Sequence, residues 1–466
     1  MSVPSFYKNR KVALLGLGLT GQSLIKYLKT CNISPICWDD DVYKRKKFKT
    51  KGIELVDLYE PELWKDIDLL IISPGIHFLY PEPHPVVKMA RENSVQITTD
   101  IDLFFENLSA NSNLKGNSKP KIICITGSNG KSTTTALIHH MLSGMSEKVE
   151  MGGNIGRPVM DLNLEDADSI KVIELSSYQI EIAGKLDADI AIFLNFSNDH
   201  LNRHGGLGGY FFSKARLFLE GNSKFNIIGI DQKEGRYLAN FLEARYDSGR
   251  VVIQISTSGP IPGSKWSVFI LNNFLIEVKA GKELFRSDLT QVLQIPGQHN
   301  KQNACASYAA CRALGVSSKN SFEKISGFRG LPHRTELVRK INGVVFVNDS
   351  KATNMDSVKK SLSTFGNIRW IAGGLKKDGD NINFKSFFPK IKKAYLIGSS
   401  AADFSFSLKG LDHEICNRLD QAVRSAYEEA KAGDTILLAP GCASFDQFES
   451  FEDRGDKFRK LVNGLT

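Results

Sequence analysis

A glycine-rich segment after a short apolar run carries the clearest chemistry in this 466-residue sequence. Residues 122–125 predict a buried strand, TGSNG follows, and Lys131 and Ser132 come just before a helical pattern. The backbone N–H groups of such a loop, the N-terminus of the next helix and the lysine ammonium together attract phosphate, and a hydroxyl after the lysine is a common Mg²⁺ ligand. Ile125 stands where the longer GxxxxGK[ST] form needs glycine, so this is the shorter GxxGKS form. A plain turn is the alternative, but a strand before and a helix after favour a nucleotide site.

Acidic and imidazole side chains follow the next predicted strands. Residues 172–179 read as a strand that ends polar and contains Glu174, and residues 190–194 form an apolar strand that leads to His200. The helix that follows carries Lys214. In isolation, Glu174 would be interpreted as a surface acid and His200 as a loop histidine with ordinary partners. Their common position at the carboxyl ends of strands beside a phosphate loop favours a metal and substrate site.

A second glycine pattern lies near the N-terminus. Residues 11–15 predict a strand, GLGLTG follows it as a GxGxxG pattern, and a helix comes next. The strand at residues 35–38 then ends in three aspartates that begin at Asp39. A dinucleotide in a dehydrogenase would satisfy this pattern, and so would a nucleotide-diphosphate sugar, because the helix N-terminus needs only a diphosphate. Two further apolar runs complete a doubly wound half.

The elements that must hold these residues predict an α/β fold with three domains. Residues 109–121 read as the first linker because they contain almost nothing able to build a core, and a loop with glycines and a proline ends the second domain near residue 330. Beyond it, Asn342-Gly343 between two apolar runs predicts a β-hairpin, and later strands alternate with helices. The predicted domains are a Rossmann-like N-terminal domain, a central P-loop ATPase-type domain and a Rossmann-like C-terminal domain, at residues 1–112, 118–330 and 331–466.

The charge and composition of the chain limit the kinds of molecule that it is expected to bind. The formal net charge is +9, and the densest basic cluster lies at residues 44–49. Solvated helix faces are favoured over a nucleic-acid patch, and the positive balance suits anionic small substrates. The sequence has no run of 18 apolar residues and no signal-peptide core, and its seven cysteines form no CxxC pair. These features predict a cytoplasmic protein with reduced thiols, without membrane insertion and without a nucleic-acid partner.

Six motifs in a fixed order resemble the Mur ligase family of ATP-dependent amide-bond ligases. They are TGSNGKS, ELSSYQ, NDHLNRH, GQHNKQN, LPHRTE and NDSKATN. The resemblance covers the chain from about residue 16 to residue 458, and GLGLTG with APGCASFDQFESFEDRG narrows it to the D-glutamate-adding branch. It implies a monomeric cytoplasmic enzyme of peptidoglycan precursor synthesis that uses ATP and Mg²⁺ at two sites. Its substrates would be UDP-N-acetylmuramoyl-L-alanine and D-glutamate, joined through an acyl phosphate.

The family motifs imply roles for individual residues. Lys131, His200 and Lys214 are implied to be catalytic. Lys214 is implied to carry a carbamate, because an ammonium would repel Mg²⁺ whereas a carbamate offers the oxygen ligands that Mg²⁺ prefers. The implied metal ligands are Ser132, Glu174, His200 and Lys214. The implied ATP-binding residues are Gly127, Ser128, Asn129, Gly130, Lys131, Ser132, Thr133, Asn300, Asn303, Arg334 and Asp349.

The remaining implied residues bind the other two substrates. Those for UDP-N-acetylmuramoyl-L-alanine are Leu19, Thr20, Asp39, Asp40, Gly75, Asn154, Gln179 and His200. Those for D-glutamate are Thr353, Lys377, Ser444, Phe445 and Phe451. Lysine, hydroxyl and backbone donors suit the two carboxylates of D-glutamate, and Phe451 would form a wall. Phe448, in the same segment, is interpreted as a core residue.

Some positions depart from the family pattern. Asn198 and Asn202 replace frequent acids, and Asp231-Gln232 stands in a stretch that often reads Asn-x-Asp-Asp, but none of these carries an assigned role. Another Mur ligase or a folylpolyglutamate synthase would share the phosphate loop and the lysine, and only CASFDQF and the length of the N-terminal domain argue against them. A dehydrogenase would leave the phosphate loop unexplained. A noncatalytic nucleotide-binding module would not need the acid, the imidazole and the second lysine together.

Overall fold

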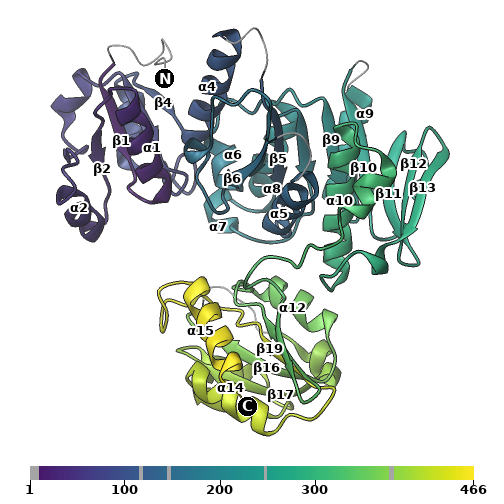
Figure 1. Ribbon diagram of the computed structural model, residues 1–466. Helices are drawn as coiled ribbons and strands as arrows, with labels where there is room; N and C mark the ends of the chain where they lie inside the picture. The colour runs from purple at the N-terminus through teal and green to yellow at the C-terminus, as the bar shows by residue number, and fades with distance from the viewer. Residues whose placement is uncertain (1–9, 115–118, 144–147, 246–248, 377–382, 466) are drawn as a thin grey trace. The chain divides into compact units, whose positions relative to one another are not determined.

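Three mostly parallel β-sheets form the framework of the chain (Figure 1). The structure is a computed structural model that describes residues 10–114, 119–143, 148–245, 249–376 and 383–465. The chain divides into two compact units, one up to Ser287 together with Gln302–Lys324, and the other with Asp288–Lys301 and the residues from Ile325 onward. The first unit contains two of the sheets and the second contains the third. The predicted α/β class is confirmed, whereas the predicted domain boundaries stay predictions.

The first sheet has four parallel strands in the order β2-β1-β3-β4. Its strands are β1 (Val12–Leu15), β2 (Ile36–Trp38), β3 (Leu69–Ile72) and β4 (Gln96–Thr98). Its helices are α1 (Leu19–Thr30), α2 (Val42–Lys49), α3 (Pro85–Glu92) and α4 (Asp100–Leu114), with the 3-10 turn η2 (Pro61–Lys65). β1 and β3 are buried throughout, as expected for parallel strands covered on both faces. The predicted strand, glycine turn and helix near the N-terminus are confirmed.

Helix α4 extends into the segment that was predicted to be a linker. Residues 109–121 read as a linker, but α4 extends to Leu114 and strand β5 begins at Lys121. The first turns of α4 carry buried apolar residues, among them Phe104 and Leu108, that pack in the core of the first unit. Once such a packed segment has nucleated a helix, each further residue adds a hydrogen bond at little cost, so polar residues can extend it. The linker prediction is therefore wrong for residues 109–114.

The second sheet has nine strands in the order β13-β12-β11-β10-β9-β8-β5-β7-β6. Its strands are β5 (Lys121–Thr126), β6 (Lys148–Gly153), β7 (Ser169–Glu174), β8 (Ile190–Phe193), β9 (Phe225–Gly229), β10 (Val251–Ser256), β11 (Trp266–Leu271), β12 (Phe274–Lys279) and β13 (Lys282–Asp288). Its helices are α5 (Lys131–Leu142), α6 (Ser177–Ile182), α7 (Leu201–His204), α8 (Leu207–Leu219), α9 (Lys233–Arg245), α10 (Gln298–Ala313) and α11 (Ser318–Glu323), with the 3-10 turns η3 (Val159–Asp161) and η4 (Leu289–Gln291). Strand β5 lies between β7 and β8 and parallel to both, so the residues that follow these three strands meet at one edge of the sheet.

The segment that contains Glu174 forms two elements rather than one long strand. Strand β7 ends at Glu174, and α6 begins at Ser177. The Ser176 hydroxyl accepts a hydrogen bond from the Gln179 backbone N–H, and the Gln179 side chain accepts one from the Ser176 backbone N–H. This reciprocal capping box is a helix start signal. The prediction of a strand through residue 179 is therefore wrong.

A buried carboxylate fastens α10 to the second sheet. Glu277 on β12 is fully buried and accepts hydrogen bonds from Trp266 Nε1 at 3.0 Å, the Tyr308 hydroxyl at 2.7 Å and Arg312 Nε at 3.0 Å. Tyr308 and Arg312 lie on α10, the helix that also carries Asn303. The carboxylate therefore sets the position of a helix that borders the phosphate loop.

We expect Glu277→Gln to lower the free energy of unfolding by about 3 kcal/mol, because the largely buried Arg312 guanidinium loses its counter-charge. The matched control is Glu283→Gln on β13, whose ion pair with Arg286 is exposed to solvent and contributes little. Urea denaturation of both variants measures the difference. Equal losses of stability in the two variants would contradict the role given to Glu277.

The third sheet has six strands in the order β14-β15-β19-β16-β17-β18. Its strands are β14 (Glu336–Ile341), β15 (Val344–Asn348), β16 (Ile368–Gly373), β17 (Ile391–Ile397), β18 (His413–Asn417) and β19 (Thr435–Leu438). Its helices are α12 (Met355–Thr364), α13 (Ala401–Ser407), α14 (Leu419–Glu428) and α15 (Phe451–Asn463), with the 3-10 turn η5 (Lys385–Lys390). Strand β14 pairs antiparallel with β15, and the other pairs are parallel.

The hairpin at Asn342-Gly343 is confirmed. Both turn residues have positive φ, 48° and 81°, as a two-residue type I′ turn requires. Strands β6 and β18 went unpredicted because they lie at sheet edges, where a partly exposed strand needs no continuous apolar run. Strand β9 went unpredicted as well, since its five residues include the polar Asn226.

Two chain-wide predictions concern thiols and membranes. All seven cysteines are buried, and none forms a disulfide in the structure; that their thiols are reduced in the cell stays a prediction. Within the described ranges, no helix has the length and apolar character needed to cross a membrane.

Candidate functional site

The loop between β5 and α5 forms the centre of the site. Gly127 and Gly130 have φ values of 147° and 86°, a region that glycine enters without strain. A Cβ at Gly130 would collide with the side-chain amide of Asn303, which is buried on α10. Helix α5 begins at Lys131, so its first N–H groups and the positive end of its dipole adjoin the loop. The predicted strand, loop and helix are confirmed as local structure, and Asn303 lies directly against the loop.

Residues after β8 hold this loop in shape. The Ser197 backbone N–H donates to Ser128 Oγ at 2.9 Å, and the Asn129 backbone N–H donates to Asn195 Oδ1 at 2.9 Å. The Asn195 amide also donates to Gln302 Oε1 on α10 at 2.9 Å. These contacts fix the loop backbone through neighbouring elements, and a fixed backbone is the condition for a preorganised anion site.

Two lysines from distant parts of the sequence meet at the loop. Lys131 Nζ donates to the carbonyls of Gly127 at 2.9 Å and Ser128 at 3.1 Å, and Lys214 Nζ donates to the same Gly127 carbonyl at 3.0 Å. Lys214 is 1% exposed, and its Nζ lies 4.5 Å from the centre of the Tyr210 ring. Burial and the Lys131 charge hold the pKa of Lys214 well below its usual range. The structure thus brings two of the predicted catalytic residues to one carbonyl group.

Glu174 ends β7 beside the loop. It is 2% exposed, and its Oε1 accepts a hydrogen bond from the Asn154 side-chain amide at 2.9 Å. Its Oε2 is buried and has no hydrogen-bond partner among the residues that the structure describes. Ser132 is buried in the first turn of α5, and Thr133 next to it is half-buried. A buried carboxylate oxygen without a partner is costly unless a cation or a donor occupies the position.

His200 follows β8 in a left-handed backbone conformation, with a φ of 53°. Its Nδ1 lies 2.9 Å from the Tyr178 hydroxyl, and its Nε2 lies 3.4 Å from Asp199 Oδ2. The imidazole is 39% exposed and so remains accessible to a ligand. A positive φ is uncommon for a residue other than glycine and is frequent at binding sites. This conformation lets α7 begin at the next residue, Leu201.

The residues around the phosphate loop offer oxygen donors of the kind that Mg²⁺ prefers. Within the described part of the chain, no three His, Cys, Asp or Glu side chains form a metal cluster. Mg²⁺ commonly takes one or two carboxylates and completes its octahedron with phosphate oxygens, hydroxyls and water. The unpartnered Glu174 Oε2 and the Ser132 hydroxyl fit one such cation at the phosphate loop. Lys214 fits a cation only as a carbamate, since its ammonium would repel the ion.

Two predicted residues of the UDP-substrate site lie at the end of β2. Asp39 is buried, and its Oδ2 accepts hydrogen bonds from the Leu17 backbone N–H at 2.7 Å and from Lys44 Nζ at 3.3 Å. Its carboxylate therefore orders the glycine turn after β1. Asp40 Oδ2 lies 2.8 Å from His84 Nε2. The structure places Asp39 against the glycine turn, and its contact with the UDP substrate stays a prediction.

The other predicted UDP-substrate residues differ in exposure. Leu19, Gly75 and Asn154 are exposed, and Thr20 is half-buried at the start of α1. Gln179 is 4% exposed, and its amide oxygen accepts the hydrogen bonds of the α6 cap. Gln179 therefore positions α6, and its direct contact with a substrate stays a prediction.

Three predicted ATP-binding residues lie in the second compact unit. Asn300 is buried near the start of α10, Arg334 is half-buried and Asp349 is buried after β15. Asp349 accepts hydrogen bonds from the Thr335 backbone N–H at 3.1 Å and from the Ser361 hydroxyl. Burial raises the pKa of Asp349 to about 6. A role for these three residues in nucleotide binding stays a prediction.

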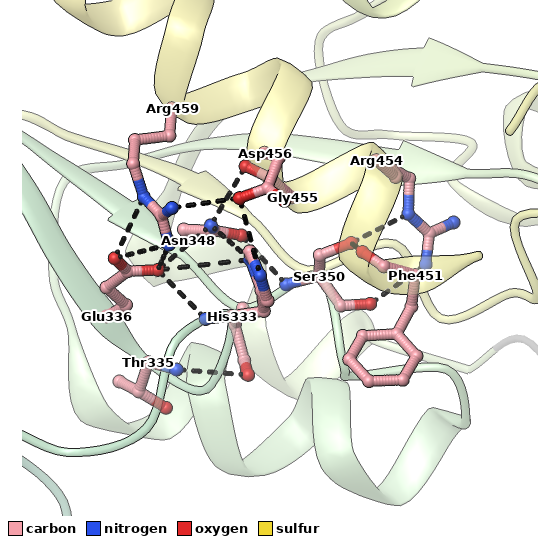
Figure 2. A network of polar contacts seen from close by, with 11 residues as sticks. His333, Thr335, Glu336, Asn348, Ser350, Phe451, Arg454, Gly455, Asp456 and Arg459 are labelled. Carbon is pink, nitrogen blue, oxygen red and sulfur yellow. Dashed lines mark hydrogen bonds and ion pairs between the residues drawn. The ribbon is translucent and has the colours of Figure 1, made fainter. Parts of the chain in front are cut away.

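A polar network fixes the turn that precedes β14 (Figure 2). Asn348 lies at its centre: its side-chain amide donates to Glu336 Oε2 at 3.1 Å and to the Gly455 carbonyl at 3.1 Å, and it lies 3.0 Å from His333 Nδ1. The Arg459 guanidinium forks onto Glu336 with contacts of 2.9 and 3.1 Å. A Cβ at Gly455 would collide with the His333 ring. The network thus joins the β14–β15 hairpin and the turn before it to helix α15, which lies about a hundred residues later in the sequence.

A buried arginine joins two motif segments in the same unit. Arg454 is fully buried and donates to Ser350 Oγ at 2.9 Å, the Ser350 carbonyl at 2.8 Å and the Cys442 carbonyl at 3.2 Å. Burial lowers the pKa of Arg454 to about 10. Figure 2 shows Phe451 on the same side of the network as Arg454. Lys351 Nζ lies 3.8 Å from the centre of the Phe451 ring. Phe451 therefore faces a cation.

The predicted D-glutamate residues are spread over exposed and buried positions. Ser444 is 2% exposed, Phe445 is 69% exposed and Thr353 is half-buried. Lys377 lies outside the described residues. Phe448 packs partly buried against a hydrophobic core of this unit, which confirms its interpretation as a core residue. Direct binding of D-glutamate by these residues stays a prediction.

Three residues at the site were not singled out from the sequence. The Tyr210 hydroxyl lies 3.2 Å from Ser128 Oγ, Asn195 shapes the loop, and Tyr178 holds His200. Tyr178 belongs to the ELSSYQ motif, so the sequence contained a signal that could have pointed to it. Tyr210 lies four residues before Lys214 on one helix, a spacing that places two side chains on the same face.

Three family models match the chain. They are described as Mur ligase MurD-like, N-terminal domain, over residues 10–99, Mur ligase middle domain, over residues 125–311, and Mur ligase, glutamate ligase domain, over residues 333–442. A relative from Cereibacter sphaeroides (strain ATCC 17025 / ATH 2.4.3), named UDP-N-acetylmuramoylalanine--D-glutamate ligase, is 46% identical over 458 residues, or 98% of either chain. A relative with the same name from Roseobacter denitrificans is 46% identical over 452 residues, or 97% of either chain.

Solved structures share the fold at lower identity. The UDP-N-acetylmuramate-alanine ligase MurC from Thermotoga maritima superimposes with a TM-score of 0.57 at 18% identity, over 98% of this chain and 99% of that one. E. coli FolC in complex with ADP gives a TM-score of 0.55 at 18% identity, over 77% of this chain and 94% of that one. At these identities the likeness establishes the fold.

The sheet order, the glycine loop at its switch point and the two converging lysines define an α/β protein of the P-loop class. The family models cover most of the chain, and the relatives match it over nearly the full length. The chain belongs to the Mur ligase family, in the branch of the UDP-N-acetylmuramoylalanine--D-glutamate ligases. The predicted organisation in N-terminal, central and C-terminal α/β domains is confirmed.

Proposed function

We propose that this chain is an ATP-dependent ligase that joins D-glutamate to UDP-N-acetylmuramoyl-L-alanine in peptidoglycan precursor synthesis. The observation that supports this most directly is the meeting of Lys131 and Lys214 at the Gly127 carbonyl, in a site that also has the unpartnered Glu174 oxygen. Such a site suits phosphoryl transfer, which needs charge neutralisation and positioning rather than a covalent nucleophile from the protein. The name of the relatives at 46% identity supports the choice of the two substrates.

The first proposed step activates the alanyl carboxylate of the UDP substrate. A carboxylate oxygen attacks the γ-phosphorus of ATP, a new P–O bond forms, and ADP leaves with the electron pair of the bond that breaks. The loop N–H groups and Lys131 bind the phosphate oxygens over which charge spreads. The partly exposed His200, oriented by Tyr178, meets the substrate carboxylate.

The second proposed step forms the amide. The neutral amine of D-glutamate attacks the acyl carbon, phosphate leaves with the bonding pair, and the new amide nitrogen loses a proton. Water would hydrolyse the acyl phosphate, so the site must exclude it. The residues proposed to bind D-glutamate are Thr353, Lys377, Ser444, Phe445 and Phe451. The enzyme is proposed to act as a monomer.

Two Mg²⁺ ions are proposed to serve the first step. When bound, they neutralise phosphate charge and orient the transferring group. Ser132 and Glu174 would hold one, and His200 with a carbamylated Lys214 would hold the other. The buried, unpartnered Glu174 Oε2 supports the first of these sites.

A coupled assay tests the proposed function. The purified protein with ATP, Mg²⁺, UDP-N-acetylmuramoyl-L-alanine and D-glutamate should release phosphate and yield a product that mass spectrometry shows to be heavier by one glutamyl residue. Omission of any one substrate should abolish the product, and L-glutamate or L-lysine should replace D-glutamate poorly. Efficient use of another amino acid would assign the chain to a different ligase, and no phosphate release with any candidate would reject ligase activity.

We expect Ser444→Ala to raise the KM for D-glutamate by about tenfold to a hundredfold. A lost hydrogen bond to a carboxylate costs roughly 1.5–3 kcal/mol, and about 1.4 kcal/mol corresponds to one decade in affinity. Steady-state kinetics should show little change in the KM values for ATP and the UDP substrate. Lys377→Ala should have the same selective effect.

The control for Ser444→Ala and Lys377→Ala is Ser425→Ala on α14. Ser425 is half-buried, and its hydroxyl donates to Glu414 at 2.9 Å. It lies outside the proposed D-glutamate residues and should leave the KM for D-glutamate unchanged. A similar rise in all three KM values for Ser444→Ala would show that this pocket has been misassigned.

A further inference from the structure

Arg203 on the short helix α7 is almost completely buried, although no step above uses it. Its side chain is 7% exposed. Nη2 donates to the Ile76 carbonyl at 3.0 Å, and Nη1 lies 3.5 Å from the Tyr80 carbonyl and 2.5 Å from Glu181 Oε2. Burial of a guanidinium is costly unless carboxylate and carbonyl oxygens compensate for the lost water. One arginine therefore joins three segments of the first unit, which are the turn after β3, helix α6 and helix α7.

These segments border both ends of the proposed UDP-substrate site. The turn at residues 76–80 directly follows Gly75, a proposed contact of that substrate. Helix α6 carries Tyr178, whose hydroxyl lies 2.9 Å from His200 Nδ1. The Arg203 guanidinium carbon lies 5.2 Å from the centre of the Tyr178 ring, within the range of a cation–π contact. Arg203 thus touches the turn next to the substrate and the ring that orients the catalytic imidazole.

Neighbouring groups make this contact rigid. His204 Nδ1 lies 3.1 Å from Glu181 Oε1, and its Nε2 lies 2.9 Å from Ser177 Oγ, so the carboxylate is held from a second side. His204 and Ser177 are buried. A Cβ at Gly205 would lie 3.1 Å from the Tyr80 ring, which shows how closely this glycine turn packs against the tyrosine. The junction between the turn after β3 and α7 is therefore tightly packed and polar.

We infer that Arg203 is a positioning residue that sets the distance between the UDP-substrate turn and His200. The inference rests on the proposed function, in which the diphosphate end of one substrate lies near the first sheet and its alanyl carboxylate meets the phosphate loop. Misplacement of a reacting group by about 1 Å can lower a rate by about a hundredfold. Arg203 acts through the turn and through Tyr178 rather than on the reacting atoms.

Arg203→Lys tests this inference because lysine keeps the charge but lacks the planar fork that reaches two carbonyls and a carboxylate together. We expect kcat/KM for the UDP substrate to fall by about tenfold to a hundredfold. The KM values for ATP and D-glutamate should stay close to those of the wild type. Calorimetric titration with UDP-N-acetylmuramoyl-L-alanine, which needs no turnover, should show weaker binding by a similar factor.

Arg216→Lys is the matched control. Arg216 on α8 donates to the carbonyls of Ile180 and Ala183 at the end of the same helix α6, and it forks onto Glu220. Its loss should destabilise α6 without moving the turn after β3. Thermal unfolding should therefore respond to both substitutions, whereas UDP-substrate binding should respond to Arg203→Lys alone.

Amide hydrogen exchange tests the positioning role of Arg203 independently of the proposed ligase activity. In the ligand-free protein, Arg203→Lys should raise the exchange of amides in residues 76–80 by about tenfold, and Arg216→Lys should not, because only the first releases this turn. Unchanged exchange there, or equal rises in all three KM values, would overturn the inference. If the wild type shows no ligase activity, the proposed function fails, and the calorimetric and exchange comparisons still decide the role of Arg203.

Discussion

Lys131→Ala is expected to lower ligase turnover by about a thousandfold or more, because a cation that stabilises the charge of a phosphoryl-transfer transition state contributes about 10³–10⁵ in kcat. Lys131 Nζ donates to the Gly127 and Ser128 carbonyls, so the loop itself holds the ammonium where phosphate is proposed to bind. The residue is half-buried at the start of α5 and is not part of a hydrophobic core. The substitution should therefore remove charge neutralisation and leave the fold intact.

The control is Lys121→Ala, at the other end of β5. Lys121 is largely exposed and pairs with Asp189, a surface contact of small energetic value. Steady-state phosphate release should be near the wild-type rate in this variant and close to background in Lys131→Ala. Circular dichroism and UDP-substrate binding should be the same for both proteins. Near-normal turnover in Lys131→Ala would show that the loop is not the phosphate site.

Lys214→Arg is expected to lower ligase turnover by about a thousandfold or more, although arginine keeps the positive charge. Lys214 is 1% exposed and lies 3.0 Å from the Gly127 carbonyl. Its lowered pKa favours the neutral amine, which is the form that adds to CO₂ and releases a proton. The resulting carbamate is an anion with two oxygen donors, whereas arginine cannot form it and would repel Mg²⁺.

A direct measurement is carbon NMR of the protein with labelled bicarbonate. The wild type should show a carbamate resonance that Lys214→Arg lacks. Lys171→Arg is the control, because Lys171 is also fully buried but forms an ion pair with Glu150. The Lys171→Arg variant should keep the carbamate resonance. Short carboxylates should partly restore activity to Lys214→Ala by supplying the missing oxygens. An active Lys214→Arg enzyme would rule out the carbamate.

Local chemistry made the phosphate loop predictable. Gly127 and Gly130 stand where the backbone needs positive φ, Lys131 follows at the start of a helix, and an apolar run precedes them. Each of these preferences acts over a few residues, so the sequence determined the strand, the loop and the helix start. The Asn342-Gly343 hairpin was predictable for the same reason, since a type I′ turn depends on two residues alone.

Where a local signal competes with packing, the sequence was less informative. Residues 109–114 look like a linker but form the last turns of α4, because the buried first turns of that helix had already nucleated it. Residues 177–179 look like the end of a strand, but the Ser176 cap begins a helix there. The capping box was visible in the sequence and would have corrected this prediction.

The tertiary structure decided which side chains meet. The sheet order β8-β5-β7 brings Asn195, the loop and Glu174 to one edge, and this order follows from long-range strand pairing. Lys214 reaches the carbonyl of a residue 87 positions earlier, and Arg203 reaches one 127 positions earlier. The sequence by itself determined the local binding elements and the family, because turns, caps and motifs are short-range. Only the packed fold, which buries these distant charges beside one another, decided their partners and lowered the pKa of Lys214.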